Sequence, residues 1–187
     1  MAKRSNKRRR AYRPQQRPKR SKHRKVLVVV EGSRDKSEAR YFELLNQELR
    51  NSYLIAITVE PGQGEPSRVL QACDARTERE RERKNINGEP FDIRILVIDV
   101  DNHQRLESTL RECKKKNIHA LVTNPKFELW LLWHLEDMNH SVTGNKLDQL
   151  VQGKKLVAGP RGKELAHNFP FGNYREAMGV RGKRGAI

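Results

Sequence analysis

The feature that most constrains the fold of this chain is Val26–Val30, a run of five apolar residues with no polar position. Four of the five are valine, a residue that favours strands, and the lack of alternation predicts a strand buried on both faces. A second run of this kind, Ile95–Ile98, lies within the segment Phe91–Asp99. Such strands belong to parallel sheets with helices on both sides, so the two runs predict an α/β fold.

The rest of the first 140 residues predicts strands and helices in alternation. Apolar residues at helical spacing, from Tyr41 to Leu49, predict a helix that ends near Arg50. Two more strands are expected at Leu54–Val59 and Ile118–Val122, and three more helices are expected at Ser67–Lys84, around Leu106, Leu110 and Cys113, and at Phe127–Leu135. Asn124 is expected to cap the last helix, with Pro125 at its first position. This order predicts a doubly wound, mainly parallel four-stranded sheet flanked by helices.

The chain divides into three parts by composition. Residues 1–24 form a basic arm that we expect to be disordered, and residues 25–140 form the α/β domain. Residues 141–187 are interrupted by glycine and proline, so we expect an irregular, loosely packed extension. Only one short helix, Lys146–Val151, and a turn at Tyr174–Met178 are predicted there.

Charge is concentrated at the N-terminus. The whole chain carries a net charge of +16, and residues 1–25 contain 13 Lys and Arg with no acidic residue, so the rest is nearly neutral. Basic arms bind polyanions through counterion release, which makes nucleic acid the expected partner; a solubilising tail is the alternative. The arginines expected to contact nucleic acid are Arg8, Arg9, Arg10, Arg20 and Arg24.

Several classes of protein are excluded by composition. No apolar run approaches the roughly 20 residues of a membrane-spanning helix, and no hydrophobic segment follows the basic N-terminus as in a secretory signal. Cys73 and Cys113 are both expected at core positions of helices, which is typical of free thiols in a reducing compartment. We therefore predict a cytoplasmic protein with no membrane partner. The oligomeric state, homo-oligomers included, is left open.

Acidic residues follow two of the buried strands directly. Glu31 follows Val26–Val30, and Asp99 and Asp101 follow Ile95–Ile98. Ligands of open α/β sheets bind at the carboxyl ends of strands, and carboxylates gathered there repel one another unless a cation lies between them. Hard oxygen ligands suit Mg²⁺ or Mn²⁺, which can orient and hydrolyse a phosphodiester. The alternative is that these acids cap helices or face solvent.

Several stretches resemble known families. KVLVVVEG (25–32) and ILVIDVD (95–101) are similar to the Toprim pattern, in which one strand ends in Glu and another in Asp-x-Asp. EGSRDKSEARYF (31–42), VIDVD (97–101) and TNPKFELWLLWHL (123–135) resemble the RloB (AbiL-type) family, found near restriction and phage-defence loci. The resemblance covers roughly residues 25–140. It implies a metal-dependent nuclease that cleaves nucleic-acid phosphodiesters in defence against phage or foreign DNA.

The resemblance also assigns roles to residues. Asp99 and Asp101 would hold Mg²⁺, or Mn²⁺, and Glu31 would complete the metal shell or act as general base or acid. Glu38 stands where the family has the Glu of a Thr-Glu pair, so it is expected beside the site. Asn124, Glu128 and His134 come from the third motif. We place Glu128 in the catalytic site and Asn124 and His134 around it, although for His134 a buried, hydrogen-bonded core imidazole is the favoured alternative.

Other activities are disfavoured by missing motifs. The chain has no Gly-x-x-x-x-Gly-Lys-Ser/Thr loop, so it is not itself an ATPase, and no Cys/His spacing suits zinc. An Asp-x-Asp phosphotransferase would carry its motif after the first strand, whereas here the motif follows the third. The main alternative to a nuclease is a non-catalytic nucleic-acid-binding effector subunit that works with a separate ATPase partner.

Overall fold

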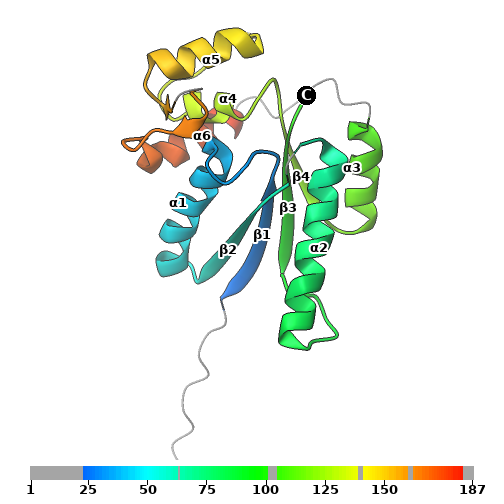
Figure 1. The fold of residues 1–187 in the computed structure, drawn as a ribbon. Coiled ribbons are helices and arrows are strands. Elements are labelled where there is room, and N and C mark those ends of the chain that lie inside the picture. The colour runs from blue at the N-terminus through cyan, green and yellow to red at the C-terminus, as the bar shows by residue number, and fades with distance from the viewer. Residues whose placement is uncertain (1–22, 63, 101–104, 139–140, 160–161, 183–187) are drawn as a thin grey trace, which may run out of the picture.

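A computed structural model describes residues 23–62, 64–100, 105–138, 141–159 and 162–182. Its centre is a four-stranded, all-parallel sheet in the order β2-β1-β3-β4 (Figure 1). The strands are β1 (Arg24–Val30), β2 (Ile55–Pro61), β3 (Ile93–Asp99) and β4 (His119–Thr123). The predicted α/β architecture with a parallel four-stranded sheet is confirmed.

Helices cover both faces of the sheet. Helix α1 (Ser37–Ser52) lies on one side, and α2 (Pro66–Lys84) and α3 (Leu106–Lys115) lie on the other (Figure 1). Alternate residues of β1 enter different clusters: Val28 packs on the α1 side and Leu27 on the α2 side. This explains the run of apolar residues without alternation. Cys73 and Cys113 are buried and free, as predicted.

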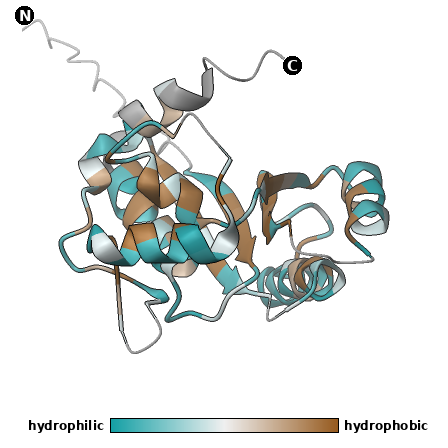
Figure 2. Ribbon diagram, turned by 90° about the horizontal axis from the view of Figure 1, so that it is seen from above, coloured by the Kyte–Doolittle hydropathy of each residue, from teal (hydrophilic) through white to brown (hydrophobic). Residues whose placement is uncertain are grey.

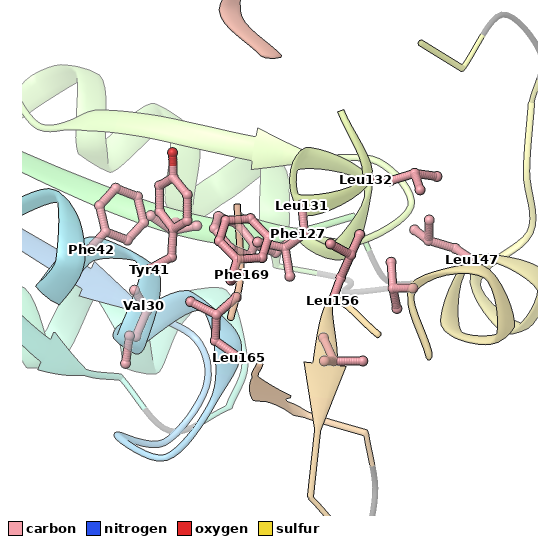
Figure 3. Close-up of a cluster of buried hydrophobic side chains, with 14 of the residues drawn as sticks. Val30, Tyr41, Phe42, Phe127, Leu131, Leu132, Leu147, Leu156, Leu165 and Phe169 are labelled. Atoms are coloured by element: carbon pink, nitrogen blue, oxygen red, sulfur yellow. The ribbon is translucent and has the colours of Figure 1, made fainter. Parts of the chain in front are cut away.

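The C-terminal part is more ordered than the sequence predicted. After α4 (Glu128–Leu132), which ends the predicted α/β domain, it contains α5 (Gly144–Gly153), the antiparallel pair β5 (Val157–Ala158) and β6 (Glu164–Leu165), a 3-10 turn (Phe171–Asn173) and α6 (Tyr174–Gly182). Leu147, Leu156, Leu165 and Phe169 are buried in the same cluster as Tyr41 of α1 (Figure 3). The expectation of loose packing is therefore wrong, because apolar residues scattered between glycines meet only in the folded chain.

The predicted start of α4 is also wrong. The Asn124–Pro125 peptide is cis, Phe127 occupies the N-cap position, and the regular helix begins at Glu128. The Phe127 N–H donates to the carboxylate of Asp99 at 3.0 Å, so a side chain from β3 satisfies a donor that a local cap would otherwise take. The helix ends at Leu132, and single turns continue to Leu135.

Hydrophobic residues gather on the strands and on the helix faces beside them, while the outer helix faces are largely hydrophilic (Figure 2). Within the described residues, no helix combines the length and the apolarity that crossing a membrane requires.

Candidate active site

The carboxyl edge of the sheet brings together Glu31 and Asp99. Because β1 and β3 are parallel neighbours, the residues at their ends lie at the same edge, with Val30 opposite Val97. The Asp99 N–H donates to Glu31 Oε2 at 3.2 Å. Two residues 68 positions apart in the sequence therefore meet where ligands of open α/β sheets bind. Asp101, the third acid predicted there, lies outside the described residues.

Asp99 is held by two neighbours in a half-buried position. The Thr123 hydroxyl and the Phe127 N–H both donate to its Oδ1 atom. The pKa of Asp99 is raised to about 6, chiefly by burial and in part by the nearby carboxylates of Glu128 and Glu31, while the hydrogen bonds from Thr123 and Phe127 oppose this shift. The Asp99 side chain is thus fixed in place, but its ionisation is less favourable than that of an aspartate in water.

Glu38 reaches the same place from the first turn of α1. The pKa of Glu38 is raised to about 7, chiefly by burial and in part by the charges of Glu128, Asp99 and Glu31. Its carboxylate packs against Gly32, where an added Cβ would lie 2.9 Å from Glu38 Oε2. Glycine after Glu31 therefore leaves room for this second carboxylate, which explains the Glu-Gly pair of the motif.

Glu128, the fourth carboxylate, begins α4 and is 3% exposed. Lys163, from the loop before β6, places its Nζ atom 3.6 Å from Glu128 Oε1 and 3.5 Å from Asp148 Oδ1 of α5. Lys126 Nζ lies 2.8 Å from the other oxygen of Asp148. Lys163 and Asp148 were not predicted as site residues, since neither belongs to a motif and only folding brings them to Glu128.

The chemistry of this acid cluster, defined as Glu31, Glu38, Asp99 and Glu128, is that of carboxylates forced together. For Asp99 and Glu38, this repulsion together with burial favours a bound proton or a bound cation. Within the described part of the chain, no three His, Cys, Asp or Glu side chains lie close enough together to hold a metal ion. Among the described residues, Glu31 and Asp99 are in contact through a hydrogen bond. Glu128 lies near enough to raise the pKa of Asp99, and the charge of Asp99 in turn raises the pKa of Glu38.

Substitution of Glu38 tests this electrostatic picture. The pKa of Glu38 is about 7 in the fold and 4.5 in the unfolded chain. The folded state therefore binds the proton more tightly than the unfolded chain does. The ionised Glu38 side chain lowers the free energy of unfolding above pH 7, and this loss is absent below about pH 4.5. Glu38→Gln should raise the melting temperature of metal-free protein by several degrees at pH 8 and by much less at pH 5. Thermal melts in EDTA measure this; Glu48→Gln, at an exposed position of α1, should change neither value. Equal melting temperatures for Glu38→Gln and wild type at pH 8 would contradict the picture.

Asn124 and His134 lie elsewhere in the fold. Asn124 is exposed and lines an apolar groove described below. His134 is buried among aromatic rings, with its Nδ1 donating to the Trp130 carbonyl at 3.0 Å and its Nε2 atom 3.3 Å from the Tyr41 hydroxyl. These contacts agree with the core interpretation of His134. The six-residue separation from Glu128, about 120° around a helix, directs the two side chains to different surroundings.

Of the arginines predicted to contact nucleic acid, only Arg24 belongs to the described residues. Arg8, Arg9, Arg10 and Arg20 lie outside the described residues. Arg24 is the exposed first residue of β1. It therefore lies one strand length, about 20 Å, from the carboxyl edge that carries the acid cluster.

The large groove of the structure does not coincide with the acid cluster. It has a volume of about 780 Å³ and lies between α1, the β3–β4 side of the sheet, α4 and α6, with apolar walls that include Leu45, Val97, Leu121, Trp130 and Met178. None of the four carboxylates lines it, although Thr123 and Phe127, which hold Asp99, form part of its wall. No carboxylate or imidazole is among its lining residues, so the groove and the candidate site are separate features of the fold.

The fold and the cluster define a class: an α/β protein whose parallel sheet carries buried and half-buried carboxylates from several elements at its carboxyl edge. The chain belongs to the RloB-like protein family, whose profile matches residues 26–177. That match extends through α5 and β6, in agreement with their place in the common core. No curated protein and no solved structure matches the chain significantly.

Proposed function

We propose that this protein is a metal-dependent nuclease of the Toprim type that cleaves nucleic-acid phosphodiesters. The observation that carries the proposal is the acid cluster itself, in which burial and neighbouring carboxylates raise the pKa of both Asp99 and Glu38. Placing ionised carboxylates together out of water costs free energy. A bound divalent cation offsets this cost, and hydrolysis of a phosphodiester is a reaction that such a site can support.

Hard carboxylate oxygens at the cluster suit Mg²⁺ or Mn²⁺. Glu31, Asp99 and Asp101 would hold the ion, the last from the segment directly after β3. Such an ion lowers the pKa of bound water and neutralises charge on the phosphate. The Thr123 and Phe127 donors fix the orientation of Asp99, and Gly32 lets Glu38 approach from α1. With a pKa of about 7, Glu38 is suited to accept a proton at neutral pH.

The basic arm supports nucleic acid as the substrate class, since 13 positive charges without an acid favour a polyanion. Family membership supports a role in defence against phage or foreign DNA, together with a separate ATPase partner. A second candidate is a non-catalytic effector subunit that binds nucleic acid. It is favoured by the finding that no three ligating side chains meet among the described residues.

The test compares full-length wild type with the triple variant Glu31→Gln/Asp99→Asn/Asp101→Asn. Supercoiled DNA, single-stranded DNA and structured RNA are each incubated with Mg²⁺, Mn²⁺ or EDTA. Wild type should cleave at least one of them only with metal, and the triple variant should bind but not cleave, since the arm is intact. Cleavage by the triple variant would reject the proposal. If neither protein cleaves and calorimetry detects no Mn²⁺ binding, the effector subunit is the better description.

A further inference from the structure

We infer that Lys163 is a positioning residue of the acid cluster, which holds Glu128 in place and ties the C-terminal β5–β6 segment to the site. Its catalytic consequence rests on the proposed nuclease function, whereas the pairing with Glu128 does not. Lys163 lies outside the three motifs from which the site was predicted, and its contribution comes from contacts made by both its side chain and its main chain.

The side chain of Lys163 supplies positive charge to a carboxylate that is almost fully buried. Lys163 Nζ lies 3.6 Å from Glu128 Oε1, and the Glu128 side chain is 4% exposed. The same ammonium lies 3.5 Å from Asp148, which Lys126 also contacts. Charges therefore alternate along Glu128, Lys163, Asp148 and Lys126, and this chain of ion pairs begins and ends near the start of α4. A buried carboxylate is costly without such a partner.

The main chain of Lys163 contacts a second helix that carries a member of the acid cluster. Its carbonyl accepts the Ser37 N–H at 2.9 Å, and Ser37 is a buried residue that directly precedes Glu38. One residue thus contacts both helix starts, α1 with Glu38 and α4 with Glu128. The turn before it lies close against α5: Gly162 has φ +58°, and a Cβ there would clash with the side-chain amide of Gln152.

The two contacts have different requirements. The hydrogen bond from Ser37 uses the main chain and survives any side-chain substitution, whereas the pairing with Glu128 needs a cation at the end of a long side chain. Lys163→Met keeps most of the length and removes the charge. Lys163→Arg keeps the charge. Differences between these variants therefore report on the ion pair rather than on the fold of the turn.

The experiment is a double-mutant cycle in the full-length protein, with Lys163→Met, Glu128→Gln and the double variant, alongside Lys163→Arg. Lys146→Met, at an exposed lysine of α5, is the matched control. In EDTA, Lys163→Met should lower the melting temperature by several degrees in wild type and by much less in the Glu128→Gln background. Lys163→Arg should restore most of the loss, and the control should show none. If Lys163→Met lowered the melting temperature equally in wild type and in the Glu128→Gln background, the ion pair between Lys163 and Glu128 would be overturned.

Cleavage supplies the catalytic readout. At a temperature where every variant is folded, Lys163→Met should cleave at least about tenfold more slowly than wild type, in the range found for residues that orient a metal site, and Lys163→Arg should recover most of the rate. Unchanged cleavage by Lys163→Met together with thermal coupling would overturn the positioning role. If wild type does not cleave any substrate, the nuclease proposal fails, and the thermal cycle alone decides whether Lys163 holds Glu128.

Discussion

Asp99→Asn is expected to abolish metal-dependent cleavage and, at the same time, to stabilise the metal-free protein at pH 8. The carboxylate is at the centre of the acid cluster, where it would hold the ion, so its neutral isostere should lower cleavage at least about a hundredfold. The asparagine Oδ1 atom can still accept the hydrogen bonds from Thr123 and Phe127, so the local structure should persist.

The stability change follows from the raised pKa. The pKa of Asp99 is about 6 in the fold and 3.8 in the unfolded chain, so the ionised side chain opposes folding above pH 6 and this penalty disappears below pH 3.8. Two pKa units correspond to a destabilisation on the order of 3 kcal/mol at pH 8, which the substitution removes. The gain in the free energy of unfolding should therefore change little between pH 8 and pH 6 and shrink between pH 6 and pH 4.

Denaturant unfolding in EDTA at both pH values and cleavage with Mg²⁺ measure the two effects in one preparation. Asp74→Asn, at an aspartate of α2 that pairs with Lys116 near the surface, is the control and should leave cleavage unchanged. A variant that loses cleavage and also loses stability at pH 8 would mean that Asp99 is a structural residue. Full cleavage by Asp99→Asn would remove Asp99 from the site.

Opposite signs for stability and activity are typical of residues kept for function. Glu38 shows the same pattern, because burial and neighbouring acids raise its pKa more than the hydrogen bond from its own backbone lowers it. A fold selected only for stability would place an apolar side chain at such a position. Two costly carboxylates at one sheet edge thus argue for a ligand that makes them favourable.

The sheet was predictable because its information is local. An uninterrupted run such as Val26–Val30 can be satisfied only by burial on both faces, and the clusters that separate Leu27 from Val28 show this burial. Helix α4 was less predictable. Its first N–H group is satisfied by Asp99, a residue from another strand, so the local pattern of Asn124 and Pro125 gave the wrong start.

The site was predictable only where residues follow strands or belong to motifs. Glu31 and Asp99 could be placed together because parallel strands share a carboxyl edge, and Glu38 came from the family resemblance. Lys163 and Asp148 come from a segment with no periodic pattern, and their link to Glu128 exists only in the tertiary structure. The lack of a periodic apolar pattern is also the reason why this segment was predicted to be loosely packed.

Leu147→Ala tests whether that segment is part of the folded unit. Leu147 of α5 is fully buried in the cluster that also contains Leu131 and Leu132 of α4 (Figure 3). Truncation should lower the free energy of unfolding by about 2–5 kcal/mol, because a buried leucine leaves a cavity that its neighbours fill only in part. Denaturant unfolding measures the loss.

Leu135→Ala is the matched control, since Leu135 is 47% exposed and should cost less than about 1 kcal/mol. Equal, small losses at both positions would mean that α5 does not pack in the core. Asp148 directly follows Leu147 and pairs with both Lys163 and Lys126, so loosening α5 should also disturb the ion pair at Glu128. Leu147→Ala should therefore reduce cleavage even at temperatures where the variant remains folded, whereas Leu135→Ala should leave cleavage intact. Such a difference would mean that the packing of the C-terminal part supports the function of the site.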